Sequence, residues 1–356
     1  TTADNNTAVG YQSLSANTTG AGNVAVGHNA SKKTTTASNN TVVGKDALEE
    51  NTTGAGNTAV GKDALQANTT ASNNTAVGLE ALHLNTTGTL NVAVGNNSLA
   101  SNVDGSRCTS VGYAALAAHD PSSAAETYNT ALGFHAGNAV TTGASNTFVG
   151  GLAGDSTDDG AGNTAIGKSA LSANCGDSNV AVGLNALIAC TNSNNTAVGT
   201  AAGDNVTSGT QNTLIGAQVE AEAAGSNNCI GLGFNIVAGA GFTTLGIDAN
   251  DIRAAHGTAT WAAVSDERYK KDITDSTAGL SFINALQPRT FKYKNLGELP
   301  ETFRAYEADS TEVFKNPDTN HGFIAQEVKA AIDADSSIKD GFRLWDDRED
   351  GSQEVA

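Results

Sequence analysis

Residues 40–65 read NTVVGKDALEENTTGAGNTAVGKDAL, so the block NTVVGKDAL that starts at residue 40 returns as NTAVGKDAL at residue 57. The glycine that follows the short apolar run in each block recurs through most of the chain, usually after 17 residues, once after 21 and otherwise after 15 or 16. A short internal period of this kind is typical of a solenoid, in which each repeat stacks on its neighbours. The glycines of the series are at positions 10, 27, 44, 61, 78, 95, 112, 133, 150, 167, 183, 199, 216, 231 and 246.

The repeat has the form N-[TV]-A-[VI]-G-x-x-A-L, followed by a polar stretch rich in Asn, Thr, Ser and Gly. Thr58 and Val60 share one parity and Ala59 takes the other, which predicts a short strand that ends in a glycine turn. A second apolar segment, such as Ala64-Leu65, predicts a second strand in each coil. About 15 coils rising by ~4.8 Å each would form a parallel β-roll or β-solenoid ~70 Å long.

The asparagine that opens each unit is expected to stack on its equivalents, so that each side-chain amide bonds the next. One coil offers only a valine, a leucine and two alanines as a core, which is little apolar area. The alanine face is then left with nothing to cover it, and we expect other chains to do so. The asparagines that we expect to stack are Asn6, Asn23, Asn40, Asn57, Asn74 and Asn91.

These units resemble the heads of trimeric autotransporter adhesins, whose repeats are of the type NSxAIG where this chain has NTAVG. The similarity spans about residues 4–250. It implies a mainly β fold, a left-handed parallel β-roll that is wound as a homotrimer.

Two features of the repeat region could be taken for functional sites. GNTAIGKS at residues 162–169 has the glycine and lysine spacing of a phosphate-binding loop, but Lys168 stands where Lys45 and Lys62 also stand, so we interpret it as one more repeat. The step from Gly112 to Gly133 holds four extra residues around His119-Asp120-Pro121, which indicates a loop insertion. That insertion is either a neutral bulge, the reading we favour, or a binding knob.

The composition of the 356-residue chain excludes several classes of function. The formal net charge of −18 argues against nucleic acid and anionic membranes as partners. The sequence contains no run of 18 apolar residues of the kind that would span a membrane. The four cysteines form no C-x-x-C pair and no histidine lies at ligand spacing, so we predict neither a metal site nor a cofactor. Buried thiols are the expected state of Cys108, Cys175, Cys190 and Cys229, with a disulfide between Cys175 and Cys190 as the alternative.

The composition changes at about residue 250. Residues 1–250 hold 6 Lys or Arg and 17 Asp or Glu, whereas residues 251–356 hold 13 and 20, together with both tryptophans. We therefore divide the chain into a repeat domain at 1–250, a neck at 251–264 and a second domain at 265–356. Because the sequence begins TTADNN without a methionine, we expect it to start inside a longer protein.

Within the second domain, local patterns predict a turn or helix cap at Ser265-Asp266, a short amphipathic helix from Leu280 to Leu286 and a strand from Phe291 to Tyr293. Three motifs in order then resemble the intramolecular chaperone domain that ends many phage tail fibres, tailspikes and endosialidases. They are SDERYKKDI at 265–273, LQPRTFKY at 286–293 and HGFIAQEV at 321–328. Such domains close with a long helix, which we expect to be missing here because the chain ends soon after DDREDGSQEV.

The resemblance implies a small α+β domain that assembles as a trimer, assists folding of the fibre and then releases itself. It implies a serine and lysine dyad, Ser265 and Lys270, and cleavage between Ser265 and Asp266. Attack on the preceding carbonyl would instead cut before Ser265, and Lys271 is the alternative base. Positive charge from Arg268 and Lys271, together with burial on assembly, would lower the pKa of the lysine.

The combined interpretation is a phage tail or appendage fibre of the virion, outside the cell. Its expected partners are two further copies of the chain, other tail proteins of the virion, and a glycan or protein receptor on the host surface. A bacterial cell-surface adhesin with the same β-roll and a non-cleaving fibre are the alternatives. A glycan-degrading spike would need paired carboxylates in a groove, and Asp158-Asp159 is the acidic pair that the later coils offer.

Overall fold

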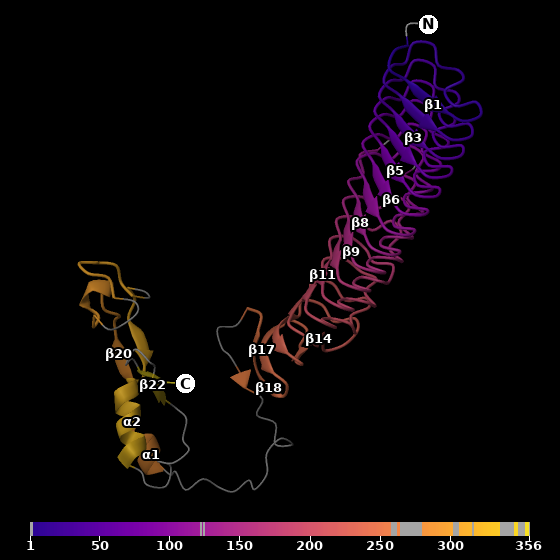
Figure 1. Ribbon diagram of the computed structural model, residues 1–356. Helices are drawn as coiled ribbons and strands as arrows, with labels where there is room; N and C mark the ends of the chain where they lie inside the picture. The colour runs from indigo at the N-terminus through magenta and orange to yellow at the C-terminus, as the bar shows by residue number, and fades with distance from the viewer. Residues whose placement is uncertain are drawn as a thin grey trace. The chain divides into compact units, whose positions relative to one another are not determined.

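The computed structural model describes residues 3–121, 123, 125–257, 262–263, 280–301, 306–314, 317–334, 345–347 and 353–355. The chain separates into two compact units, residues 1–264 and 265–356. The first unit is a rod of stacked coils, and the second is a small mixed α and β unit (Figure 1). Each unit is described by itself below.

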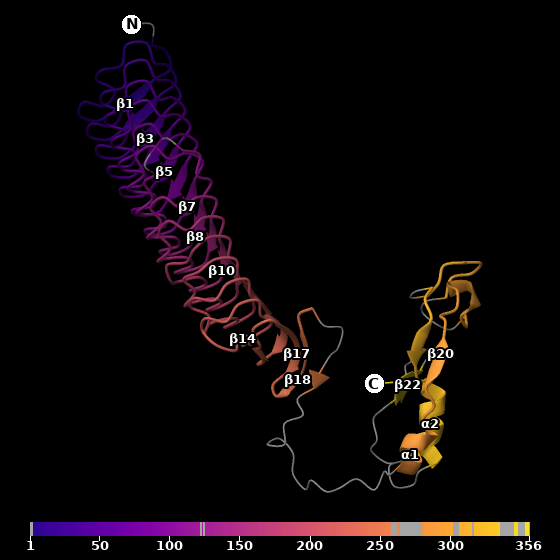
Figure 2. The same cartoon turned by 180° about the vertical axis from the view of Figure 1, so that it is seen from behind.

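The rod is built on one sheet whose parallel strands follow one another coil by coil, a pattern visible from both sides (Figures 1 and 2). Equivalent residues pair directly, so Thr58 lies opposite Thr75 and Val60 opposite Val77. Of the 17 strands in this sheet, all but β18 and β19 belong to the parallel series, which makes 14 turns. The predicted mainly β solenoid with a period near 17 is confirmed, with about one coil fewer than expected.

The parallel strands are β1 (Thr7–Val9), β2 (Val24–Val26), β3 (Thr41–Val43), β4 (Thr58–Val60), β5 (Thr75–Val77), β6 (Val92–Val94), β7 (Thr109–Val111), β8 (Thr130–Leu132), β9 (Thr147–Val149), β10 (Thr164–Ile166), β11 (Val180–Val182), β12 (Thr196–Val198), β13 (Thr213–Ile215), β15 (Ile230–Phe234) and β17 (Phe242–Ile247). A shorter parallel pair, β14 (Glu220–Ala221) and β16 (Val237–Ala238), lies beside them near the end of the rod. At that end β17 turns back on β18 (Asn250–Ala255), which pairs antiparallel with β17 and with β19 (Ala262–Ala263). These last two strands lie in the segment expected to form a neck, residues 251–264.

The second apolar segment of most coils is a series of turns, so the prediction of two strands per coil is wrong except near the end of the rod, where this segment forms β14 and β16. Asp46 and Leu48 both adopt left-handed backbone angles, with φ of 56° and 49°. Alternating left-handed residues fold this segment too tightly for strand geometry. The coils still bond to one another there, since the N–H of Leu48 donates to the carbonyl of Ala64 at 2.9 Å.

The core lies inside each coil, between the alanine of the strand and the leucine of the turn segment. Ala59 and Leu65 are fully buried, whereas Thr58 and Val60 point outward and are partly exposed. Our expectation that the alanine face needs other chains to cover it is therefore wrong. The coil closes on its own alanines, and the face left uncovered is that of the outward threonine and valine side chains.

Phe148 shows how tightly that core is filled. It replaces the strand alanine, and Gly137 and Gly154 replace the core leucines of two coils. A Cβ at Gly154 would lie 2.5 Å from the Phe148 ring, and one at Gly137 would lie 2.7 Å from it. The ring therefore occupies the volume that two leucine side chains leave empty. A similar exchange occurs where Leu214 lies against Gly203.

The glycine series needs one correction near the end of the rod. Gly231 pairs with Leu214 in the interior of the sheet, whereas Gly233 continues the series between Gly216 and Gly246. The positive φ of 156° at Gly233 matches that of the earlier turn glycines. Sequence spacing alone does not separate the two glycines of IGLGF because they share the same parity.

The second unit holds two helices and two short antiparallel strand pairs among its described residues. The predicted helix begins at Leu280 as expected, and the predicted strand lies two residues earlier than expected. Phe282 of the first helix and Val328 and Ile332 of the second are buried, and the two helices are in contact. The elements are α1 (Leu280–Ala285), β20 (Arg289–Phe291), the 3₁₀ helix η2 (Leu296–Glu298), β21 (Asn320–Gly322), α2 (Ala325–Ala334), β22 (Trp345–Asp347) and β23 (Gln353–Val355).

Candidate functional site

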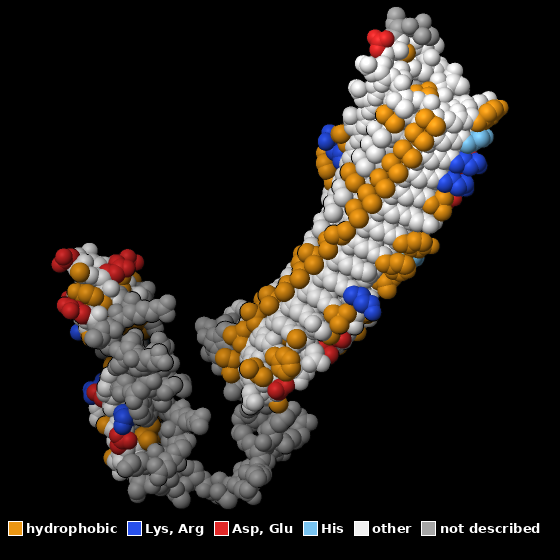
Figure 3. Space-filling model, viewed as in Figure 1, with side chains coloured by type: hydrophobic (Ala, Val, Ile, Leu, Met, Phe, Trp, Pro, Cys, Tyr) orange, Lys and Arg blue, Asp and Glu red, His pale blue; other side chains and the backbone are white. Residues whose placement is uncertain are grey.

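The outward face of the parallel sheet carries a continuous apolar row, which we call the apolar stripe (Figure 3). Its most exposed members include Val9 at 57% and Leu132 at 49% of their surface, and the others are partly exposed. An uninterrupted apolar surface of this length is rare on a monomer and is typical of an interaction site. The stripe consists of Val9, Val26, Val43, Val60, Val77, Val94, Val111, Leu132, Val149, Ile166, Val182, Val198, Ile215, Leu232 and Leu245.

Inside the rod, the asparagines at the start of each unit form the predicted ladder. The predicted bonds between side-chain amides occur in the later coils, as from Asn212 to Asn195 at 3.0 Å, whereas in the earlier coils the amides bond the backbone. The side-chain oxygen of Asn40 accepts the backbone N–H of Asn57 at 2.8 Å. The side-chain nitrogen of Asn57 then donates to the carbonyl of Ala71 at 2.9 Å. The amides therefore satisfy backbone groups at the strand ends, where a strand of three residues leaves donors without partners.

A second asparagine ladder, which our sequence analysis missed, joins side chain to side chain. The amide nitrogens of Asn68, Asn85 and Asn102 each donate to the amide oxygen of the asparagine one coil earlier, at 2.9, 3.1 and 3.0 Å. All of these side chains are buried. The recurrence of NTT at residues 51–53, 68–70 and 85–87 is the signal that would have predicted it.

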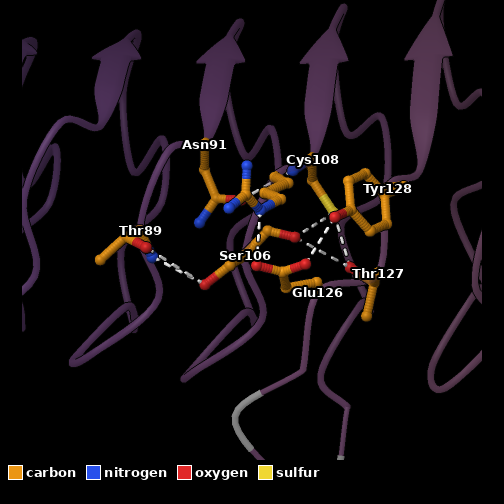
Figure 4. Close-up of polar contacts among 8 residues, drawn as sticks. Thr89, Asn91, Ser106, Cys108, Glu126, Thr127 and Tyr128 are labelled. Atoms are coloured by element: carbon orange, nitrogen blue, oxygen red, sulfur yellow. Dashed lines mark hydrogen bonds and ion pairs between the residues drawn. The ribbon is translucent and has the colours of Figure 1, made fainter.

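Both ladders are interrupted in the coil that carries the insertion. Cys108 stands in the first ladder and His119 in the second, and both are buried. The hydroxyl oxygen of Thr127 lies 2.9 Å from Cys108 Sγ and 3.0 Å from His119 Nε2, so it joins the two (Figure 4 draws its contact with Cys108). Asn102 Oδ1 and His119 Nδ1 find no hydrogen-bond partner among the described residues. Burial lowers the pKa of His119 to about 4, so the ring is neutral at pH 7.

On the surface of the same coil, three side chains fasten the end of the insertion. Arg107 Nε donates to Glu126 Oε1 at 2.7 Å, and the Tyr128 hydroxyl donates to Glu126 Oε2 at 2.5 Å (Figure 4). The hydrogen bond from Tyr128, followed by that from Arg107, lowers the pKa of the Glu126 carboxyl. The insertion therefore rejoins the coil stack at Glu126, where Ser106 and Glu126 form a parallel bridge.

The cysteines of the rod are free thiols, and the alternative of a disulfide between Cys175 and Cys190 is wrong. Cys175 Sγ instead lies 3.2 Å from the hydroxyl of Thr157, and burial raises its pKa to about 11. Among the described residues, no group of three or more His, Cys, Asp or Glu side chains could hold a metal ion. No helix in the described part of the chain combines the length and apolar character needed to cross a membrane.

The remaining polar candidates of the rod lie on its surface. Lys168 occupies the turn after Gly167, whose φ is 130°, as Lys45 and Lys62 do after their repeat glycines. The phosphate-loop spacing is therefore a product of the repeat. Asp158 and Asp159 are exposed, and Asp158 accepts a hydrogen bond from the Thr141 hydroxyl of the preceding coil.

In the second unit, the two later sequence motifs are joined by an ion pair. Arg289 in β20 donates to both carboxylate oxygens of Glu327 in α2, at 2.9 and 2.7 Å. These bonds hold the pKa of the Glu327 carboxyl below its ordinary value. Thr290 lies opposite His321 in the strand pair, with Oγ1 3.3 Å from Nδ1. Contacts between unlike residues therefore hold the motifs LQPRTFKY and HGFIAQEV together.

The predicted reactive residues Ser265, Asp266 and Lys270 lie outside the described residues, as do the alternative base Lys271 and the nearby Arg268. The dyad and the position of the cleaved bond therefore stay predictions. What the structure does describe is the region that follows them, from α1 to α2.

Comparison with known proteins separates the two units. Residues 265–335 match the family model described as chaperone of endosialidase. The match covers about the first three quarters of the second unit, including α1, β20, β21 and α2. This is the domain that the three sequence motifs predicted, so we call residues 265–356 the chaperone unit. No curated protein and no solved structure matches the chain, and the resemblance of the rod to adhesin heads stays a prediction.

Proposed function

We propose that this chain forms a homotrimeric fibre, whose rod is aligned by the chaperone unit at its C-terminal end. The chaperone match over residues 265–335 is the observation that carries the proposal. The apolar stripe supports it, because a rod with this surface needs partners along its whole length. Three copies that turn their stripes inward would supply those partners.

The free energy gained by burying the apolar stripe is large enough to favour assembly. If association buried ~50 Å² on each of about fifteen side chains, the gain would be at most on the order of 20 kcal/mol per chain at ~25 cal/mol per Å². The loss of translational and rotational freedom subtracts roughly 4–15 kcal/mol from it. Association is therefore favourable only if most of the stripe is covered, which a match between aligned rods achieves.

Alignment is the problem that the chaperone unit would solve. Sliding one chain along another by a whole coil brings valine against valine again, so shifted pairings lose only their ends. A unit with unique contacts at the end of the rod holds the chains level before the stripes meet. Trimerisation would therefore begin at the chaperone unit and proceed along the rod.

We further propose that the fibre matures by a single self-cleavage beside Ser265, with Lys270 as the base. Lys270 would take the proton of the Ser265 hydroxyl, and the oxygen would attack a neighbouring backbone carbonyl. Attack on the carbonyl of Val264 forms an ester that water hydrolyses, which cuts before Ser265. Attack on its own carbonyl, which the family's cleavage position between Ser265 and Asp266 would require, forms a strained four-membered ring.

The test is a denaturing gel of the full chain beside Ser265→Ala and Lys270→Ala, with Lys294→Ala, an exposed lysine of the chaperone unit, as the matched control. We expect the wild type and the control to give two fragments that divide near residue 265, and the other two variants to stay whole. Mass spectrometry of the fragments then assigns the bond. A wild-type chain that stays whole after trimerisation would contradict the cleavage and leave the trimeric fibre unaffected.

The location that we propose is the tail or appendage of a phage virion, where the fibre contacts a host-surface glycan or protein. The chaperone match supports this over a bacterial surface adhesin, the alternative that the repeat alone favours. Peptide mass fingerprinting of purified virions and of bacterial envelopes separates the two. Rod peptides in envelopes of uninfected cells would favour the adhesin.

A further inference from the structure

A line of exposed side chains runs along the rod beside the apolar stripe, one residue after each repeat glycine, and we call it the outer column. Figure 3 shows blue and orange side chains of this line, separated from the stripe by a white band. The column reads Tyr11, His28, Lys45, Lys62, Leu79, Asn96, Tyr113, Phe134, Gly151, Lys168, Leu184, Thr200, Ala217 and Phe234. Gly151 is the one position in this column without a side chain.

Gly151 leaves a gap in the column. A Cβ built at this residue would meet no atom within 4 Å beyond its two neighbours in the chain. Equivalent coils are ~4.8 Å apart, so the residues on either side of the gap, Phe134 and Lys168, are separated by ~10 Å along the rod. Stacked ring systems place their centroids ~4.5–7 Å apart, so a flat ring of one residue's thickness fits between these two side chains.

One wall of the gap is aromatic. Phe134 is 56% exposed, and its other face is stacked on Tyr113, with ring centroids 5.5 Å apart and planes at 13°. His135 packs against both rings, at 4.2 Å from Phe134 and 5.4 Å from Tyr113. These contacts fix the orientation of the Phe134 ring, so stacking a ligand on it costs little conformational entropy of the protein.

The other wall is a cation without a counter-ion. Five of the six Lys and Arg residues in 1–250 pair with carboxylates; Lys45 and Lys62, for example, pair with the aspartates that follow them at 2.8 and 2.7 Å. Lys168 is the sixth; it is followed by Ser169 and forms no ion pair with the described residues. Its ammonium group is therefore available to a carboxylate on a ligand.

We propose that this gap, the Gly151 notch, binds a pyranose ring that carries a carboxylate, as uronic and sialic acids do. The apolar C–H face of the sugar stacks on Phe134, and its carboxylate pairs with Lys168. The proposal deepens the proposed contact of the fibre with a host surface, on which its biological role rests.

The test uses the full chain carrying Ser265→Ala, with binding measured by fluorescence anisotropy. The labelled probes are a glucuronate-containing hyaluronan tetrasaccharide and sialyllactose, with the carboxyl-reduced tetrasaccharide and lactose as neutral counterparts. Gly151→Leu fills the notch with a residue that the column accepts at Leu79 and Leu184. Ala217→Leu makes the same kind of change elsewhere in the column, and Lys168→Gln removes the charge.

We expect at least one acidic probe to bind, and the probe that binds identifies the source of the sugar. Gly151→Leu and Lys168→Gln should each weaken that binding by about tenfold or more, while Ala217→Leu leaves it unchanged. Equal binding of the neutral counterpart, equal binding by Gly151→Leu and Ala217→Leu, or binding of neither acidic probe would overturn the notch. Native mass spectrometry of the same samples tests the trimer separately, so a trimer that binds neither probe would leave the proposed fibre intact.

Discussion

The rod and the chaperone unit are stabilised by opposite kinds of contact. In the rod, like contacts like: Asn57 bonds to Asn40 and to Asn74, and Thr58 lies opposite Thr75. In the chaperone unit the contacts join unlike residues, as between Arg289 and Glu327. Repetition therefore gives length and a stack of equivalent bonds, but it does not define which coil meets which between chains. In the proposed trimer, unique contacts would define the alignment, so each region would supply what the other lacks.

Removing the chaperone unit should have the largest effect on assembly. A chain that ends at residue 264 keeps every coil but loses the unit that we propose aligns three copies, so we expect aggregates or a mixture of alignments. The measurement is the yield of discrete trimer by size-exclusion chromatography with light scattering. Full-length Ser265→Ala is the control, because it keeps the unit attached. A well-behaved trimer from the truncated chain would show that the rod aligns itself.

Phe148 allows the regular coils to be compared with the coils in which phenylalanine replaces the strand alanine and glycine replaces the core leucine. Phe148→Ala leaves the volume between Gly137 and Gly154 empty, and we expect it to lower the free energy of unfolding by about 3–5 kcal/mol. Adding Gly154→Leu to that variant restores the usual core leucine and should recover part of the loss. Urea unfolding of the full-length protein measures both changes. If Gly154→Leu were harmless in the presence of Phe148, the ring would not occupy the leucine volume.

The coil with the insertion differs from its neighbours in its response to acid. Burial holds the pKa of His119 at about 4, against ~6.5 when unfolded. The stability that the neutral ring allows is complete above pH 6.5 and is lost as the pH falls towards 4, by about 3 kcal/mol in total.

His119→Asn extends the second ladder through this coil and removes the titrating group. We expect the variant to lose less stability than the parent between pH 7 and pH 4, as measured by thermal unfolding at each pH. The regular coils supply the control, since Asn85→His places the same group in an uninterrupted part of the ladder and should increase the acid sensitivity. An unchanged pH profile for His119→Asn would show that the buried histidine is not the source of the acid sensitivity.

The period, the short strands and the first asparagine ladder could be predicted because each is a local pattern that repeats. The side of the strand that faces the core could not be predicted. Alternation places Ala59 on one side and Thr58 and Val60 on the other, but it does not say which side lies inside the coil. The coil closes through residues such as Leu48 that adopt a left-handed backbone conformation. Leucine seldom adopts this conformation, so the sequence does not predict it. The motifs at 265–273, 286–293 and 321–328 predicted the chaperone unit, but whether Ser265 and Lys270 meet depends on a fold that sequence spacing does not describe.

The native mass of full-length Ser265→Ala, with and without a charge in the apolar stripe, distinguishes a trimeric fibre from a single rod. We predict a mass three times that of the 35.8 kDa chain. Val94→Glu should abolish that species, because three carboxylates would then be buried together, whereas Thr87→Glu, an exposed position away from the stripe, should preserve it. A monomer for the parent protein, or an unaltered trimer with Val94→Glu, would contradict the account.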